Sequence, residues 1–271
     1  LPRLKVMRRP VFGAGGLQVL LSGVALGLLA HAGGLGWTTA WVVGLGLALS
    51  STAVGLQLLA ERGELQSEHG RLGFAILLFQ DLAAIPLLAA IPLLGHAANP
   101  EVHTGMAVAK AIGAIAALLL GGRYVLRHLF RVIARTGMPE VFTAASLLAV
   151  LGSAWLMQAV GLSAGLGAFL AGLLLAESEY RHELESQIRP FEGLLLGLFF
   201  MAVGMSLDLQ RVAAEPAMIV LGVALLLAVK FALLFALGLR TGRLEWRGSL
   251  KLGAVLALGG EFAFVVFKEA M

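Results

Sequence analysis

The sequence predicts an all-α membrane protein with about nine transmembrane helices. Of its 271 residues, 59% are hydrophobic and 13% are charged, whereas soluble domains average about 45–50% and about 25%. The hydrophobic residues fall into nine stretches, most of which approach the roughly 20 residues that a helix needs to cross a bilayer. The basic residues alternate between the segments that connect these stretches. Together these observations exclude a soluble enzyme and a disordered chain.

Most of the nine stretches reach or approach the length of a membrane span. The first contains Gly23 and Gly27, a spacing that favours close packing of membrane helices. The second, third, eighth and ninth hold polar residues deep inside. The sixth is short, and Ser163 at its start suits the N-cap of a helix. The predicted spans are Val11–His31, Trp37–Ala60, Leu72–Leu94, Gly105–Gly122, Val141–Val160, Ser163–Ala176, Phe191–Leu207, Pro216–Leu239 and Gly248–Phe267.

The distribution of Lys and Arg predicts the orientation of the spans. Sixteen of these residues lie in the N-terminal segment and in every second connection, whereas the other connections hold one, Arg211. Basic residues concentrate in the cytoplasmic loops of membrane proteins, so we expect the N-terminal end of this chain in the cytoplasm. The net charge of +4 therefore reflects membrane topology, and no nucleic-acid partner is expected.

Three charged residues lie deep inside predicted spans, namely Asp81, Lys230 and Glu261. Each costs about 2.5–3.5 kcal/mol at the centre of a membrane helix, so such residues pair, face water or carry function. One interpretation is a buried pair of Asp81 and Lys230 that fixes helix packing. The other is a site that binds an ion.

The surroundings of Asp81 favour a small cation. Gln80 precedes it, and Pro86 follows it at a distance at which the proline ring clashes with the carbonyl of Leu82. We expect the helix to bend there and to free a carbonyl one turn from the carboxylate. Backbone groups that lack partners at membrane depth are tolerated beside protein or a water-filled cavity.

Two spans carry a matching interruption. The second contains Leu47-Ala48-Leu49 followed by Ser50, Ser51 and Thr52, whose hydroxyl groups compete with the helix for backbone hydrogen bonds. The ninth contains Leu256-Ala257-Leu258 followed by Gly259, Gly260 and Glu261. The predicted topology makes these two spans run in opposite senses. Paired interrupted helices of opposite sense are typical of inverted-repeat secondary transporters, whose site lies where the helices cross.

An intramembrane hydrolase is the alternative from another class. Residues 161–165 match the pattern G-x-S-x-G, but this segment opens a membrane helix, and no histidine lies deep in any span. Cysteine is absent, which excludes disulfides and a cysteine nucleophile. No catalytic residue and no bound cofactor are therefore expected in this chain.

Six stretches of the sequence also carry a family resemblance. They are Leu47–Thr52, Phe74–Pro92, Val141–Ala145, Ala176–Glu185, Gly193–Leu207 and Gly259–Phe267. They closely resemble the glutathione-gated potassium-efflux antiporters of the Kef type, which belong to the cation:proton antiporters. The resemblance extends over essentially the whole chain.

The resemblance implies a domain organisation. The family has about thirteen membrane helices in inverted repeats, so this chain is expected to be a fragment that lacks the first three and the last. A C-terminal domain with nucleotide and glutathione sites would also be missing. Within 1–271 the resemblance implies core helices at 11–95 and 216–267, a linking helix at 105–122, and helices of the dimer type at 141–207.

The resemblance also implies roles for individual residues. Asp81 matches the aspartate that binds the ion and the proton, and Lys230 matches its charge partner. A loop, His182–Phe191, matches the segment that touches the regulatory domain. In it, Gln187 stands where the family usually has an acidic residue, which puts tight inhibition by that domain in doubt. The implied site comprises Gln80, Asp81, Ser50, Ser51, Thr52, Lys230, Gly259, Gly260 and Glu261, with His182, Glu183, Glu185 and Gln187 in the regulatory loop.

The expected function is exchange of K+ for H+, with K+ held at Asp81. The resemblance implies gating by glutathione and its adducts, a homodimer in the bacterial inner membrane, and a soluble oxidoreductase-like ancillary subunit. The alternatives are a Na+/H+ antiporter of the same fold, a channel-like path, and a structural membrane subunit.

Overall fold

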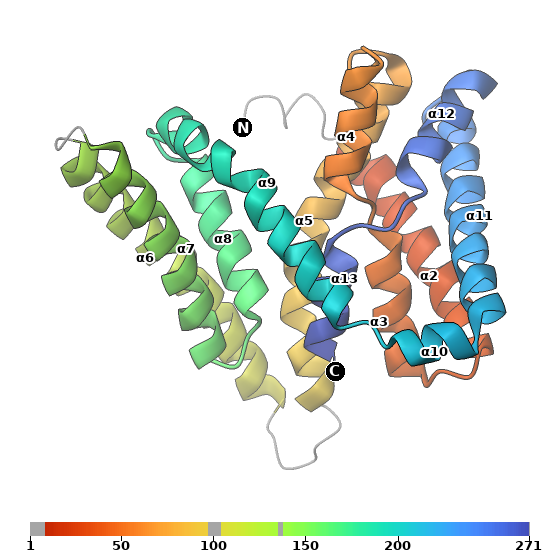
Figure 1. The fold of residues 1–271 in the computed structure, drawn as a ribbon, viewed down its shortest axis with the longest axis horizontal. Coiled ribbons are helices and arrows are strands. Elements are labelled where there is room, and N and C mark those ends of the chain that lie inside the picture. Colours follow the sequence, from red (N-terminus) through yellow and green to blue (C-terminus); the bar gives the residue numbers. More distant parts are fainter. Residues whose placement is uncertain (1–8, 97–103, 135–137, 271) are drawn as a thin grey trace. The chain divides into compact units, whose positions relative to one another are not determined.

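The computed structural model describes residues 9–96, 104–134 and 138–270, and nearly all of them are helical (Figure 1). The chain forms two compact units, the first made of Leu1–Leu87 with Asp208–Met271 and the second of Leu88–Leu207. The helix α5 (Glu68–His96) passes from the first unit to the second. The prediction of an all-α protein is confirmed for the described residues.

The first unit contains the elements on which the deep polar residues lie. Besides the first part of α5, these elements are the π-helical segment η1 (Arg9–Gly15) and the α-helices α2 (Gly16–Ala32), α3 (Trp37–Ala48), α4 (Thr52–Glu61), α10 (Leu209–Ala214), α11 (Pro216–Arg240), α12 (Trp246–Leu256) and α13 (Phe262–Ala270). The second predicted span is thus divided into α3 and α4, and the ninth into α12 and α13.

Glycine allows α2 and α3 to pack closely. A Cβ atom on Gly44 of α3 would lie 2.4 Å from the carbonyl oxygen of Gly23 and 2.5 Å from the amide nitrogen of Gly27, both in α2. A side chain at position 44 would therefore push the two backbones apart. The packing predicted for Gly23 and Gly27 is confirmed.

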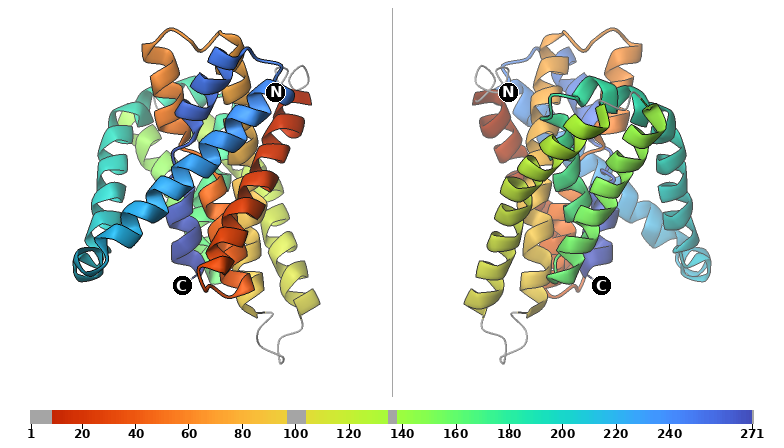
Figure 2. Two further views of the ribbon diagram at one scale, coloured as in Figure 1. Left: turned by 90° about the vertical axis from the view of Figure 1, so that its right-hand side faces the viewer. Right: turned by 90° about the vertical axis from the view of Figure 1, so that its left-hand side faces the viewer.

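Buried aliphatic side chains from η1, α5, α11, α12 and the turn between α11 and α12 form the core of the first unit. Within this unit α11 lies against α2 and α12 (Figure 2). Lipid tails are as apolar as leucine, so close packing and hydrogen bonds hold such helices together. The core residues are Ala14, Leu72, Ile76, Leu77, Leu234, Leu237, Leu244, Leu252 and Leu256.

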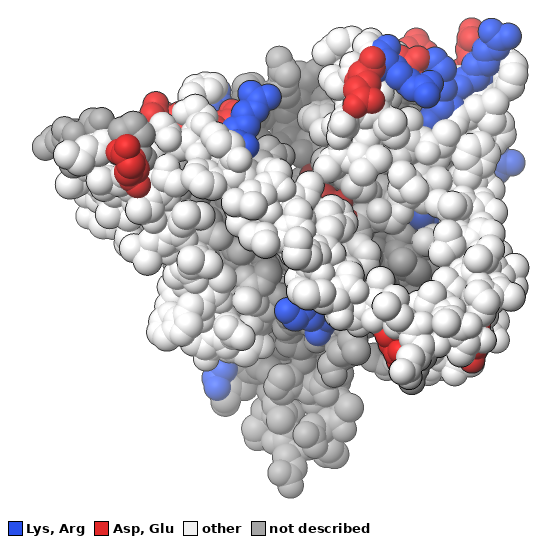
Figure 3. Space-filling view, viewed as in Figure 1, with Lys and Arg blue, Asp and Glu red and all other residues white. Residues whose placement is uncertain are grey.

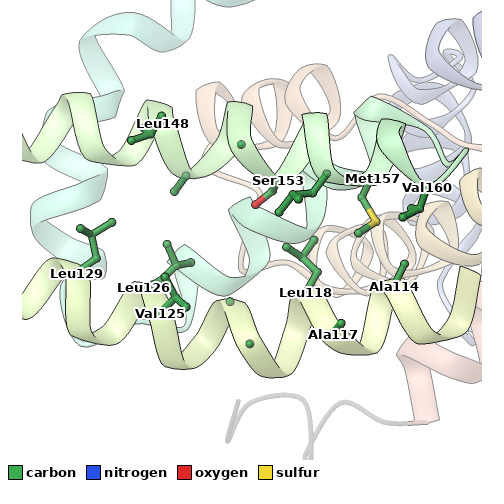
Figure 4. Close-up of a pocket in the computed structure, with 15 residues that line it drawn as sticks. Ala114, Ala117, Leu118, Val125, Leu126, Leu129, Leu148, Ser153, Met157 and Val160 are labelled. Carbon is green, nitrogen blue, oxygen red and sulfur yellow. The ribbon is translucent and has the colours of Figure 1, made fainter. Parts of the chain in front are cut away.

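The second unit consists of the end of α5 with α6 (Thr104–Ala134), α7 (Pro139–Ala159), α8 (Ala164–Ala176) and α9 (Arg181–Met205). The rings of Phe130 and Phe142 pack 5.0 Å apart at the junction of α6 and α7. Between these two helices lies a groove of about 470 Å³ lined by small and aliphatic side chains (Figure 4). Ser153 is the one polar side chain among its lining residues.

The described residues contain five helices that are long and apolar enough to cross a membrane, and a sixth if the bent helix α9 counts as one span. The other three predicted spans correspond to the two divided ones and to α8, which has 13 residues. The chain is therefore a multi-pass membrane protein, and the count of nine stays a prediction. The five are Val11–Ala32, Glu68–Ile91, Ala109–Ile133, Glu140–Ala159 and Pro216–Arg240.

Two charged segments predicted as loops are helical. α6 continues beyond Gly122 to Ala134 and carries Arg123, Arg127 and Arg131. The predicted regulatory loop 182–191 lies in the first half of α9. Both predictions were wrong because charged residues end an apolar run without ending a helix, and Arg, Leu and Glu are good helix formers.

Charged side chains of the first unit gather at one end, around the end of α4 and the start of α12 (Figure 3). A contact joins two of the basic connections there, because the ammonium of Lys251 forms an ion pair with the carboxylate of Glu64. The predicted topology places both connections on the same side of the membrane. The structure brings these two connections together, and the identity of that side stays a prediction.

Candidate functional site

The second predicted span is broken at its hydroxyl residues. α3 ends at Ala48, and Leu49 and Ser51 have extended backbone with ψ of 143° and 113°. α4 then begins at Thr52, where the Oγ of Ser51 accepts a hydrogen bond of 3.4 Å from the amide of Val54. The serine oxygen thus supplies the acceptor that the amide of Val54 lacks at the start of a helix. The predicted interruption at Ser50, Ser51 and Thr52 is confirmed.

The ninth predicted span is broken at its glycines. α12 ends at Leu256 and α13 begins at Phe262. A Cβ atom on Gly260 would lie 2.7 Å from the carbonyl oxygen of Ser50, so only glycine permits the two breaks to approach this closely. A Cβ on Gly259 would meet open space.

The two breaks are joined by backbone hydrogen bonds. Ser50 and Gly259 form an antiparallel bridge, and the amide of Gly260 donates to the carbonyl of Leu49 at 3.0 Å. The hydroxyl of Ser50 donates to the carbonyl of Leu256, the last residue of α12, at 2.7 Å. Backbone groups that each break releases are therefore satisfied by the other break, as an apolar membrane interior requires.

Lys230 binds both breaks from α11. Its side chain is fully buried, and its Nζ donates to the carbonyls of Leu49 at 2.9 Å and Leu258 at 3.1 Å. The expected pairing with Asp81 was wrong, because no ion pair joins these two residues in the described structure. Each carbonyl follows the C-terminus of a half-helix, where the helix dipole is negative and attracts a cation.

Gln80 also binds the first break. Its Oε1 accepts a hydrogen bond from the amide of Ser50 at 2.9 Å, and its Nε2 donates to Oε1 of Gln18 at 2.6 Å and to Oγ of Ser50 at 3.4 Å. The amide of Gln80 is 1% exposed. In this structure the side-chain oxygen of Gln80 binds the backbone of the first break, and ion binding by Gln80 stays a prediction.

Gln18 and Ser22 of α2 also belong to this polar network and were not among the predicted site residues. Gln18 is 1% exposed, and its Nε2 donates to the carbonyl of Ala48 and to Oγ of Ser22, each at 3.1 Å. A signal was present in the sequence, since Gln18 is an amide inside the first apolar stretch.

Asp81 lies beside the first break with one oxygen free. Thr52, the first residue of α4, donates from Oγ1 to Oδ1 of Asp81 at 3.0 Å. The other oxygen, Oδ2, accepts no hydrogen bond from the residues that the structure describes. Asp81 and Glu261 are both half-buried and close enough for their charges to interact. A half-buried carboxylate with a free oxygen can hold a proton or a cation.

The residues expected in the regulatory segment belong to the second unit. His182, Glu183 and Glu185 are exposed on α9, and Gln187 is half-buried. Nε2 of Gln187 donates to Oε1 of Glu183 at 3.3 Å, one turn away. α9 bends by 51° between Arg181–Phe191 and Gly193–Met205, where Pro190 removes a backbone hydrogen-bond donor.

The G-x-S-x-G segment has a structural role. Ser163 caps α8, since its Oγ accepts from the amide of Leu166 at 3.4 Å. This confirms the predicted N-cap.

Two broken helices that meet at their breaks, beside a buried lysine and two half-buried carboxylates, are the arrangement typical of secondary transporters. The chain matches the family described as "Sodium/hydrogen exchanger, transmembrane" over residues 1–270 and belongs to that family. It is therefore a cation/proton antiporter in the general sense, and a transporter rather than an enzyme.

Proposed function

We propose that this protein exchanges K+ for H+ and that the two ions compete for Asp81. The observation that carries the proposal is the half-buried carboxylate of Asp81 beside the crossing. Thr52 donates to one of its oxygens, and the other accepts no hydrogen bond from any described residue. A carboxylate binds a proton or a desolvated cation, but binding both at once is unfavourable. Competition of this kind couples the movement of one ion to that of the other.

Neighbouring charges support this competition. Lys230 is bound to the carbonyls of the breaks, so no ion pair with it neutralises Asp81. Because Gln80 is uncharged, we infer that one proton is exchanged for one K+ without net charge movement.

Alternating access to the site would follow from movement around the crossing. In inverted-repeat transporters, one group of helices rocks against another around a fixed site. Here the hydroxyl of Thr52 contacts the carboxylate directly, so protonation or cation binding at Asp81 changes a contact on α4. Such a contact transmits the state of the carboxylate to a half-helix.

Potassium as the cation, and glutathione as the gating ligand, rest on the resemblance of the stretches around Asp81 and Glu261 to the glutathione-gated antiporters. The exposed acidic residues Glu183 and Glu185 on α9 suit a docking segment for a regulatory domain. We propose that the intact protein is a homodimer of the bacterial inner membrane, with the N-terminal end of this chain cytoplasmic. Nucleotide and glutathione would bind a C-terminal domain, and an oxidoreductase-like subunit would assist it.

Flux assays test the proposal. We expect vesicles that contain the intact protein to show proton movement driven by a K+ gradient, and Asp81→Asn to abolish it. Asp208→Asn, an exposed aspartate outside the site, is the control and should retain exchange. Exchange retained by Asp81→Asn overturns the proposal.

Parallel gradients of Na+ and K+ distinguish the two cations. A stronger response to Na+ would favour a Na+/H+ antiporter of the same fold. Single-channel currents would indicate a channel-like path, and turnover that depends on membrane voltage would contradict one-for-one exchange.

A further inference from the structure

We propose that Gln18 of α2 is a positioning residue for ion exchange, which fixes the orientation of the Gln80 amide and thereby the shape of the first break beside Asp81. This inference rests on the proposed exchange site at Asp81. It assigns a role to a residue that contacts neither ion. Three polar groups surround the Gln18 amide: the carbonyl of Ala48, the hydroxyl of Ser22 and the amide of Gln80.

Every polar group of the Gln18 side chain has a hydrogen-bond partner. A glutamine amide has one acceptor oxygen and two N–H donors. The donors bind the carbonyl of Ala48 and the hydroxyl of Ser22, and the oxygen accepts from Nε2 of Gln80. Ser22 is itself fully buried. A polar group at this depth is costly unless it is bonded in this way.

These contacts determine which way the Gln80 amide points. Oε1 of Gln18 faces Gln80 and can only accept, so the NH2 group of Gln80 must face Gln18. Oε1 of Gln80 then faces the amide of Ser50 at 2.9 Å. A reversed Gln80 would place its NH2 group against that N–H donor and its oxygen against the oxygen of Gln18. Both contacts would be repulsive.

The two glutamines together replace helical hydrogen bonds at the break. Where a helix ends, its last carbonyls lose the N–H donors that would bind them within the helix. The amides of the residues that follow likewise lack acceptors. Gln18 binds such a carbonyl, that of Ala48, and Gln80 binds such an amide, that of Ser50. The first break is thus held on one side from α2 and on the other from α5.

The position of Asp81 depends on this arrangement. Asp81 follows Gln80 on α5, and Thr52, which donates to Asp81 at 3.0 Å, lies two residues after Ser50. Anchoring Gln80 to Ser50 therefore fixes the register between the carboxylate and the start of α4. Loss of Gln18 would release the Gln80 amide and let this register vary, which would weaken cation binding.

Two substitutions test this role. Gln18→Leu removes all three hydrogen bonds at similar volume, and we expect the KM for K+ to rise on the order of tenfold. The kcat should change less, because the lost interaction shapes the binding site in the ground state. Gln57→Leu is the matched control, since Gln57 is exposed and its side chain donates to Glu61, one turn away on α4. It should leave KM unchanged.

Gln18→Glu provides a readout that a merely structural role would not give. A protonated glutamic acid can donate to the carbonyl of Ala48, whereas an ionised one repels that oxygen. Two charged residues lie on the elements that contact Gln18 and its partners: Lys230 binds the adjacent carbonyl of Leu49, and Asp81 follows Gln80 on α5. We expect the exchange rate of Gln18→Glu, divided by that of the wild type, to fall as pH rises.

The outcomes separate this inference from the proposed function. A wild-type KM in Gln18→Leu overturns the inference. If that variant fails to fold, a pH-independent ratio for Gln18→Glu overturns it instead. Should Asp81→Asn retain exchange, the proposed function fails, whereas loss in Asp81→Asn together with normal Gln18 variants contradicts the role of Gln18 alone.

Discussion

Lys230 places a buried ammonium group on two backbone carbonyls. The carbonyls of Leu49 and Leu258 follow the C-termini of α3 and α12, so the charge lies at the negative ends of two half-helices. An isolated ammonium at membrane depth would be unstable, and these contacts explain why it is retained. Lys230 thus holds the two breaks together.

The contacts of Lys230 predict how its loss combines with the loss of Asp81. Lys230→Met removes the donor of both carbonyls, and we expect a fall of roughly 1–3 kcal/mol in the free energy of unfolding. Because Lys230 forms no ion pair with Asp81, the stability effects of Lys230→Met and Asp81→Asn should add. Thermal denaturation of the purified single and double variants measures this.

An ion pair would give a different result. In that case Asp81→Asn would rescue part of the loss that Lys230→Met causes, because the aspartate would otherwise remain buried and unpaired. A double variant more stable than Lys230→Met alone would contradict the contacts seen here.

At the scale of elements, both breaks could be predicted from local sequence. Three consecutive hydroxyl residues and two adjacent glycines weaken a helix wherever they occur. The partners of the breaks could not be predicted, because Gln18, Gln80 and Lys230 reach them from other helices. The opposite charges of Lys230 and Asp81 suggested an ion pair. The backbone carbonyls of Leu49 and Leu258 bind Lys230 instead, and the sequence does not show that these carbonyls lack helical partners.

The turn between α4 and α5 is bound to α12 by a small polar cluster. Glu64 accepts from Lys251 of α12 and lies 3.0 Å from Nε2 of His69. These hydrogen bonds lower the pKa of Glu64 below its ordinary value of 4.5. The cluster joins one half of the first broken span to one half of the second.

The lowered pKa of Glu64 predicts the pH dependence of this contact. A carboxyl group whose pKa is lower in the folded state stabilises the fold above its unfolded pKa, and the effect disappears as pH falls through the folded value. We therefore expect Glu64→Gln to melt below the wild type at neutral pH and to converge with it below about pH 4.5.

Melting temperature as a function of pH checks this expectation. Glu68→Gln, an exposed carboxylate in the first turn of α5, is the control. A difference between Glu64→Gln and the wild type that persists unchanged into acid would contradict the role of the ionised carboxylate.

At the scale of the whole molecule, the alternation of basic residues predicts which segments share a side of the membrane. The structure joins the connections that contain Glu64 and Lys251 at one end of the first unit (Figure 3). Whether this end faces the cytoplasm is not determined by the packing, because orientation depends on how the chain is inserted into the membrane. The exact extents of α6 and α9 were likewise not predictable, because helices continue past the apolar residues that define a span.

The absence of cysteine in the sequence allows a direct test of orientation. Single cysteines at Arg243 and at Leu35 should react with an impermeant maleimide from opposite sides, with Arg243→Cys labelled from the cytoplasm. Labelling of both from one side would contradict the predicted topology.

Proton release on ion binding tests the central claim, that K+ and H+ take turns on Asp81. Adding K+ to the purified protein in weak buffer, near the pH at which Asp81 is half protonated, should release protons in proportion to the K+ bound. Asp81→Asn should release none, while Asp208→Asn should behave as the wild type. Potassium binding without proton release in the wild type, or equal release from Asp81→Asn, would contradict competition at this carboxylate.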